Sequence, residues 1–149
     1  MRIVYFSEVF LPKIDGVVNT LLRLFEYLEE NDHDSLLLVP HSSIPSTSST
    51  QIITYRSFPL VLYPNVYGSF PSLNKTIDYL KEFQPDLVHL INPAYFDLAG
   101  LKAAKILNIP VVASFQTDFP GWAKTLGFGF LQKPIWRYFR NIHNQAELN

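Results

Sequence analysis

The chain begins MRIVYFSEVFLPKIDGVVNTLLRLFEYL, residues 1–28, and this stretch decides the fold. Residues 2–6 are rich in β-branched and aromatic side chains, which is typical of a strand. From Val17 onward the apolar residues recur every three or four positions, which predicts a helix with one buried face. The two elements are joined by a loop that ends in Asp15-Gly16. We therefore expect a strand, a loop and a helix, the first half of a βαβ unit.

The Asp15-Gly16 pair is the first candidate site. Asp15 is suited to cap the predicted helix, and Gly16 leaves the first turn without a side chain, so that backbone N–H groups there can approach an anion closely. A simple turn with a helix cap explains the same two residues equally well. The sequence contains neither the glycine pattern of dinucleotide-binding proteins nor that of P-loop proteins. A standard Rossmann dehydrogenase is therefore not indicated.

Composition limits the classes of protein that fit. A length of 149 residues with 48% hydrophobic side chains suits one compact domain. Zero cysteines exclude disulfides and thiolate metal sites, and four scattered histidines do not suggest a catalytic metal, so we expect no metal or cofactor. The N-terminus lacks the pattern of a signal peptide, and no apolar run reaches the ~20 residues that span a bilayer. We expect a cytoplasmic protein.

The rest of the chain alternates strands and helices. After the first helix, the predicted order is strand, strand, helix, strand, helix, strand and a final helix that begins near Pro134. The predicted strands are 35–39, 52–55, 87–91 and 111–115, and the predicted helices between them are 73–83 and 97–107. Continuous apolar strands suit a parallel sheet covered on both faces. We therefore predict an α/β fold with a doubly wound, mostly parallel, Rossmann-like sheet.

Polar residues gather where the predicted strands end. Ligands in open α/β sheets bind outside the carboxyl ends of the strands, and Asn92 and the run Gln116-Thr117-Asp118 occupy such ends. Asp118 has a second interpretation, as the cap of a short following helix. His89 lies in the middle of a predicted strand, where a packed or hydrogen-bonded histidine is expected instead of a catalytic one.

Two segments suggest contact with a partner. Residues 57–71 are apolar but interrupted by prolines, and we predict a hydrophobic loop that either packs under the domain or forms a lip, carrying Tyr63 and Tyr67, against a lipid or a bulky acceptor. Residues 1–100 hold 6 Lys and Arg against 11 Asp and Glu, whereas residues 101–149 hold 6 against 2. In this second part, basic and aromatic side chains alternate in a way that suits nucleic acid, an anionic membrane or merely a solvated face. The residues that we assign to a membrane or lipid surface there are Trp122, Phe128, Arg137 and Arg140.

Four motifs, in order, make the chain recognisable. They are FLPKIDGVV at 10–18, QPDLVH at 84–89 with NPA at 92–94, ASFQTDFP at 113–120, and the stretch from WR at 136–137 to HNQA at 143–146. Over nearly its whole length the chain resembles the N-terminal domain of family 4 retaining glycosyltransferases of the GT-B fold. Within that family it looks closest to the glycolipid-making branches, namely sulfoquinovosyl-diacylglycerol synthases and related glucosyl- and mannosyltransferases.

The resemblance implies a two-domain enzyme that moves a sugar from a nucleotide donor to an acceptor with retention of configuration and no required metal. The loop that matches Asp15, Gly16 and Val17 would lie against the donor diphosphate. The position of Gln116 usually carries histidine; glutamine can bind a sugar hydroxyl but cannot take a proton, so this residue is not a general base. We place Asp118 beside it as a catalytic candidate, and Asn92, Thr117 and Lys124 in the acceptor cleft.

The same resemblance implies that residues 1–149 are a single acceptor-side domain whose donor-binding C-terminal domain is not in this chain. We expect no turnover by these residues alone. The expected partners are a nucleotide sugar, held mostly by the missing domain, a lipid or glycan acceptor, and an anionic membrane surface to which the protein attaches peripherally. The alternative is a non-catalytic module of the same fold that binds a phosphorylated ligand or a lipid. Nucleic-acid binding ranks last, because the overall net charge is −1 and no recognition motif occurs.

Overall fold

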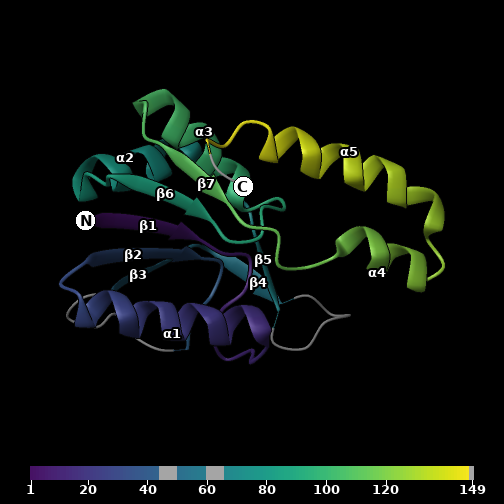
Figure 1. Cartoon of the computed structure of the whole chain (residues 1–149), viewed down its shortest axis with the longest axis horizontal. Coiled ribbons are helices and arrows are strands. Elements are labelled where there is room, and N and C mark those ends of the chain that lie inside the picture. Colours follow the sequence, from purple (N-terminus) through teal and green to yellow (C-terminus); the bar gives the residue numbers. More distant parts are fainter. Residues whose placement is uncertain (44–49, 60–65, 148–149) are drawn as a thin grey trace.

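Five parallel strands form the central sheet of the protein. The computed structural model describes residues 1–43, 50–59 and 66–147, and of Trp122 the backbone only. The strand order is β3-β2-β1-β6-β7, and every neighbouring pair is parallel. The chain starts in the middle of the sheet, builds one half outward and then returns to build the other half, which confirms the predicted doubly wound α/β fold (Figure 1).

The sheet strands and helices fall close to their predicted positions. The central strands are β1 (Arg2–Phe6), β2 (Asp34–Val39), β3 (Thr50–Thr54), β6 (Leu87–Leu90) and β7 (Val111–Ala113). The helices are α1 (Gly16–Glu30), α2 (Leu73–Phe83), α3 (Asp97–Leu107), α4 (Phe119–Thr125) and α5 (Gln132–His143), with a short 3-10 turn, η1 (Gly129–Leu131), before the last.

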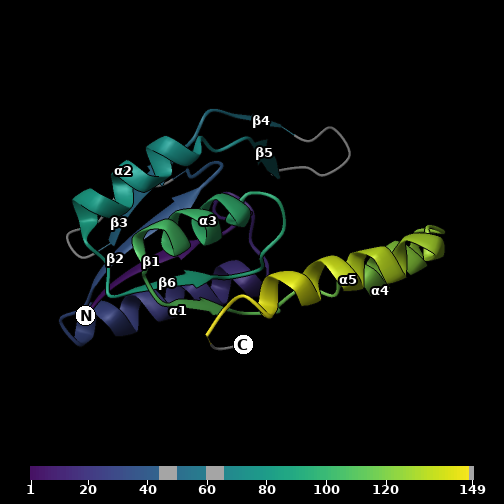
Figure 2. The ribbon, with the colours of Figure 1, turned by 90° about the horizontal axis from the view of Figure 1, so that it is seen from above.

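Helices cover both faces of the sheet. Helix α1 lies on one face, where Leu21 and Phe25 pack with Tyr5 of β1. Helices α2 and α3 lie on the other, where Leu80 and Leu101 pack with the next β1 residue, Phe6 (Figures 1 and 2). Successive strand residues point to opposite faces, so the continuous apolar strands feed two separate cores.

Side-chain and backbone groups define the ends of the helices. The Asp15 carboxylate accepts the N–H of Val18 at 3.0 Å and caps α1 as predicted. Asn108 ends α3 in the left-handed conformation, which asparagine tolerates better than most residues. Ser72 precedes α2, but its side chain makes no capping bond, since the Thr76 hydroxyl bonds back to the Ser72 carbonyl instead.

The prediction of an irregular loop at residues 57–71 was wrong on both sides of residues 60–65, which lie outside the described residues. Strands β4 (Ser57–Pro59) and β5 (Tyr67–Ser69) pair in an antiparallel hairpin. The pairing tolerates Pro59 because this two-stranded ribbon consists only of edge strands and Pro59 is the last residue of β4. The hairpin does not lie hidden under the domain either, because Phe58 and Phe70 at its base are both exposed.

Helices α4 and α5 form an arm that extends beyond the sheet (Figures 1 and 2). Along α5, Phe139 and Ile142 are buried, whereas Trp136 is 41% exposed. The difference arises because α5 touches the body mainly near its C-terminal end, while its N-terminal half packs on α4 and η1. In the described parts of the chain, no helix is both long and apolar enough to cross a bilayer.

Candidate functional site

The carboxyl ends of three strands meet at one edge of the sheet. Phe6 is level with Leu90, and Leu90 is level with Ala113. The segments that follow β1, β6 and β7 therefore leave the sheet side by side. This edge carries the glycine loop, the turn between β6 and α3, and the segment that leads to α4, as ligand sites in open α/β sheets do.

The loop before α1 is partly occupied by its own side chains. The Asp15 carboxylate holds Lys13 Nζ at 2.7 Å as well as the Val18 N–H. Partial burial acts to raise the pKa of Asp15, but the bond and charge of Lys13 and the N–H groups of Val18 and Val17 outweigh it and lower the pKa. A Cβ added to the exposed Gly16 would meet no atom within 4 Å. Open space above Gly16 is therefore the place where an anion can approach, whereas the Val17 side chain is buried in the core.

The turn between β6 and α3 is held by side chains from two distant segments. Oε1 of Glu8, which follows β1, accepts the N–H of Phe96. The Tyr138 hydroxyl of α5 donates to the Ala94 carbonyl at 2.7 Å. The loop after β1 and the arm thus both converge on residues 92–97.

A pair of carboxyl groups lies at this turn. Asp97, the first residue of α3, is fully buried, and neither of its carboxyl oxygens has a hydrogen-bond partner among the described residues. Burial, followed by the neighbouring Glu8 carboxylate, raises the pKa of Asp97 well above its usual range, although the nearby N–H of Asn92 acts in the opposite direction. Burial also raises the pKa of Glu8 to about 7, although the N–H groups of Phe96 and Asp97 act in the opposite direction. Two carboxyl groups this close cannot both ionise cheaply, so the pair carries a proton at neutral pH.

The phenol of Tyr138 completes the group. Burial, followed by the charges of Glu8, Asp97 and Tyr95, raises the pKa of Tyr138 to about 12, so the hydroxyl keeps its proton and its bond to Ala94. The cluster offers a ligand hydrogen-bond acceptors, because the one hydroxyl proton of Tyr138 is already donated to Ala94, and it lies where the fold places ligands.

The other predicted residues lie at the same edge in different environments. Asn92 follows β6 as expected, but its side chain is buried and its Oδ1 has no partner in the described part of the chain, so it does not line an open cleft. Gln116 and Lys124 are exposed and Thr117 is half-buried. Asp118 Oδ1 accepts the N–H of Gly121 at 2.8 Å, which confirms its interpretation as a cap of α4.

His89 is structural, as predicted. Its Nε2 lies 2.7 Å from the Ser114 hydroxyl, which links β6 to the segment after β7, and its ring packs against Tyr5. Burial lowers the pKa of His89 to about 4, so the imidazole is neutral at physiological pH.

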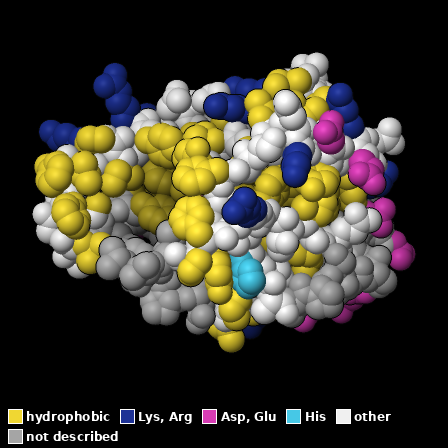
Figure 3. Space-filling model, turned by 180° about the vertical axis from the view of Figure 1, so that it is seen from behind, with side chains coloured by type: hydrophobic (Ala, Val, Ile, Leu, Met, Phe, Trp, Pro, Cys, Tyr) yellow, Lys and Arg dark blue, Asp and Glu magenta, His cyan; other side chains and the backbone are white. Residues whose placement is uncertain are grey.

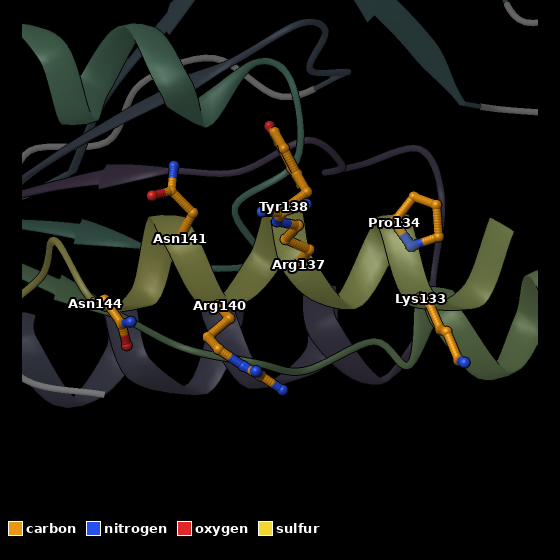
Figure 4. Close-up of a pocket in the computed structure, with 7 residues that line it drawn as sticks. All are labelled: Lys133, Pro134, Arg137, Tyr138, Arg140, Asn141 and Asn144. Carbon is orange, nitrogen blue, oxygen red and sulfur yellow. The ribbon is translucent and has the colours of Figure 1, made fainter.

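The basic residues of the arm share one face of α5. Residues spaced three, four or seven apart lie on the same side of a helix, and Lys133, Arg137 and Arg140 have this spacing. They line an open hollow of about 820 Å³ together with Pro134, Tyr138, Asn141 and Asn144 (Figure 4). In the described residues none of these three cations has an ion-pair partner. Seen from behind, hydrophobic side chains gather toward the end of the molecule that carries the arm, and acidic ones lie at the opposite end (Figure 3).

The predicted lip is only partly supported. Tyr67 is half-buried and stacks on His41 with ring centroids 4.1 Å apart, so it presents little free surface. Phe128 is exposed near the tip of the arm. Tyr63 lies outside the described residues, and of Trp122 the structure places only the backbone, within α4.

Comparison with known proteins decides the family. A sequence model of Glycosyltransferase Family 4 matches residues 14–149. The chain belongs to this family. A GDP-mannose-dependent alpha-mannosyltransferase of Mycolicibacterium smegmatis is 33% identical over 99% of the chain and 40% of the relative's length. The sulfoquinovosyl transferase SQD2 of Arabidopsis thaliana is 29% identical over 91% of the chain and 27% of its length.

The fold also has a solved counterpart. The Bordetella bronchiseptica enzyme WbmG, crystallised with NAD, superposes with a TM-score of 0.50 at 14% identity, covering 76% of this chain and 36% of that one. This similarity concerns the fold alone. The family 4 chain spans well under half the length of the two curated relatives named above.

Sequence reasoning missed Glu8, Asp97 and Tyr138. The position of Glu8, immediately after the first strand, was a usable signal, because that is where α/β sheets bind ligands. Asp97 was read only as the start of a helix, and nothing local reveals that it is fully buried. Tyr138 reaches the site through a contact 44 residues away in sequence, which no local pattern predicts.

Proposed function

We propose that this chain is the acceptor-side domain of a longer, two-domain glycosyltransferase that transfers a sugar from a nucleotide donor to a lipid acceptor with retention of configuration. The match to the family model over residues 14–149 carries the proposal. Two observations support it: the named curated relatives are transferases longer than this chain, and the candidate site lies at the open carboxyl edge of the sheet.

Most of the predicted residues have a role in this proposal. The donor diphosphate approaches over Gly16, where there is open space, and Asp15 and Val17 shape the loop beneath it. Gln116 binds a sugar hydroxyl without acting as a base, and Thr117 and Lys124 lie beside the acceptor path. Asp118 caps α4 and so positions this segment. Asn92 is buried at the start of the turn that carries Tyr95, so we assign it no direct contact with the acceptor.

The basic stripe of α5 supplies contact with an anionic membrane in this proposal. A cation near such a surface contributes ~1 kcal/mol, so Lys133, Arg137 and Arg140 together give reversible, salt-sensitive attachment. The exposed aromatic and aliphatic side chains at the tip of the arm, among them Phe128 and Phe130, add apolar contact. The protein would then work at the cytoplasmic face of a membrane without spanning it.

Two experiments test the proposal. The complete reading frame that contains this chain should transfer labelled sugar from UDP-glucose or GDP-mannose to a membrane-lipid extract, whereas residues 1–149 alone should give no product. Absence of transfer by the complete protein from every nucleotide sugar offered would contradict the enzymatic proposal.

Co-sedimentation with vesicles tests the membrane contact separately. Residues 1–149 should bind vesicles that contain phosphatidylglycerol at low salt and release them at high salt. Replacing Lys133, Arg137 and Arg140 by glutamine should abolish this binding. The matched control replaces three exposed cations on α1 and α2, Arg23, Lys75 and Lys81, and should retain it. Equal loss in both triple variants would show that net charge, not the α5 stripe, attracts the membrane.

A further inference from the structure

Three exposed aromatic rings form a continuous row beside the candidate site. Phe58 and Phe70, at the base of the β4–β5 hairpin, stack with ring centroids 5.7 Å apart. Phe70 meets Tyr95 edge-on at 5.4 Å, which joins the hairpin to the turn before α3. The rings are 43%, 71% and 58% exposed. Large exposed aromatics that touch one another mark an interaction surface, whereas scattered ones need no explanation.

The row ends at a carboxyl group. Glu8 accepts the N–H of Phe96, so its carboxyl lies against the peptide bond that joins Tyr95 to Phe96. Asp97 is buried next to it with both oxygens unpartnered among the described residues. The turn that carries the exposed ring of Tyr95 is therefore in direct contact with a hydrogen-bond acceptor, the Glu8 carboxyl.

This combination discriminates among ligands. An acyl chain would fit the rings but would strip water from Glu8 without giving it a partner, which costs free energy. A phosphate or sulfonate would be repelled by the carboxyl pair. A pyranose ring offers both complements, since its C–H face can pack on an aromatic face, which carries negative charge density, and its hydroxyls can donate to a carboxylate.

We propose that Phe70, Tyr95 and Glu8 form a binding platform for a pyranose ring of the acceptor, with the N–H groups of Phe96 and Asp97 holding the Glu8 carboxyl in place. The role of this ring as an acceptor rests on the proposed function; the binding itself does not. Near neutral pH Glu8 is partly protonated and can both accept from and donate to a hydroxyl, which suits groups that do the same.

Saturation-transfer NMR on residues 1–149 with methyl α-D-glucopyranoside tests the platform. Saturation of the protein should transfer to the ring protons of the sugar, and Tyr95→Ala should reduce the transfer at least fivefold. Tyr27→Ala is the matched control, because Tyr27 lies on α1 and is also 58% exposed; it should leave the signal unchanged. No transfer with the unaltered chain, or equal transfer with Tyr95→Ala, would overturn the proposal.

The carboxyl pair is tested by the pH profile of the same signal. Binding by the unaltered chain should change between pH 5 and 8, and Glu8→Gln should weaken it severalfold and remove the pH dependence. Asp97→Asn should leave both the binding and its pH dependence in place, because Glu8 is held by the N–H groups of Phe96 and Asp97, which this substitution keeps. A profile that Glu8→Gln does not alter would exclude Glu8 from the platform. Circular dichroism confirms that each variant is folded.

Binding to vesicles distinguishes recognition of a sugar from insertion of the aromatic row into lipid. Neutral phosphatidylcholine vesicles should bind the chain more tightly when they contain monoglucosyldiacylglycerol, and Tyr95→Ala should remove only this increment. If Tyr95→Ala instead weakens binding to plain vesicles equally, the row inserts into lipid and the pyranose proposal fails. Membrane binding through the α5 stripe and sugar transfer by the complete protein are measured in separate assays. Failure of the pyranose proposal therefore leaves the proposed function standing.

Discussion

The Tyr138 hydroxyl donates a 2.7 Å hydrogen bond to the carbonyl of Ala94, and this bond joins the arm to the turn that carries the candidate site. Near it, Phe115 packs edge-on against Phe139 at 5.6 Å, which forms a second contact between α5 and the strand end. A movement of the arm would therefore also move the turn between β6 and α3.

Tyr138→Phe should loosen the arm without unfolding the sheet. The substitution removes one hydrogen bond at a partly exposed position, which costs about 1 kcal/mol. Hydrogen exchange followed by mass spectrometry should be faster in α4 and α5 and unchanged in β1 and β6. Tyr27→Phe removes an exposed hydroxyl from α1 and serves as the control. Unchanged exchange in the arm would show that aromatic packing alone holds it.

The carboxyl pair should make the protein less stable as the pH rises. Glu8 has a folded-state pKa of about 7 against an ordinary 4.5, so the folded state binds the proton more tightly and stability is lost between about pH 4.5 and 7. Glu8→Gln should therefore match the unaltered chain at pH 4 and exceed its unfolding free energy by about 2 kcal/mol at pH 8. Urea titrations at the two pH values measure this difference. A gain of the same size at pH 4 would mean that packing, not ionisation, is responsible.

His89, unlike Glu8, should make the protein less stable as the pH falls. Its pKa falls from 6.5 to about 4 on folding, so the unfolded state binds the proton more tightly, and stability is present above pH 6.5 and is lost as the pH falls to 4. His89→Gln should remove this loss, which amounts to at most about 3 kcal/mol, while its amide can still bond to Ser114. Urea titrations of the Glu8→Gln background between pH 4 and 7 isolate the histidine. A loss that persists in the double variant would assign it to another group.

The sequence predicted the sheet well because burial on both faces leaves a continuous apolar signal. Runs such as 35–39 and 111–113 are specified by their own side chains, and so are the caps at Asp15 and Asn108. The hairpin at 57–69 was missed because its pairing is nonlocal and its strands have three residues each, too few to show a period.

The candidate site was less predictable for a physical reason. Its location follows from topology, since ligands gather where parallel strands end, and the sequence identified Gly16 and Asn92 on that basis. Which side chains are buried there depends on contacts such as Glu8 with Phe96, across 88 positions of sequence. Burial and the proximity of like charges create the unusual pKa values, and neither is visible in a local pattern.

Alanine substitutions at two glycines, Gly100 and Gly16, test core packing and ligand access separately. A Cβ on Gly100 would lie 2.6 Å from the ring of Phe6, which is fully buried and cannot withdraw without displacing the core. Gly100→Ala should therefore destabilise the chain by about 1–3 kcal/mol or more, although alanine favours a helix by about 1 kcal/mol.

A Cβ on Gly16 meets nothing, so Gly16→Ala should leave the unfolding free energy within about 0.5 kcal/mol of the unaltered chain. In the complete protein the same change should nevertheless lower sugar transfer, because the methyl group occupies the space through which the donor phosphate is proposed to approach. Urea titration and the transfer assay on the two variants decide the matter: full activity in Gly16→Ala would remove this glycine from the donor site and leave it as a helix start only.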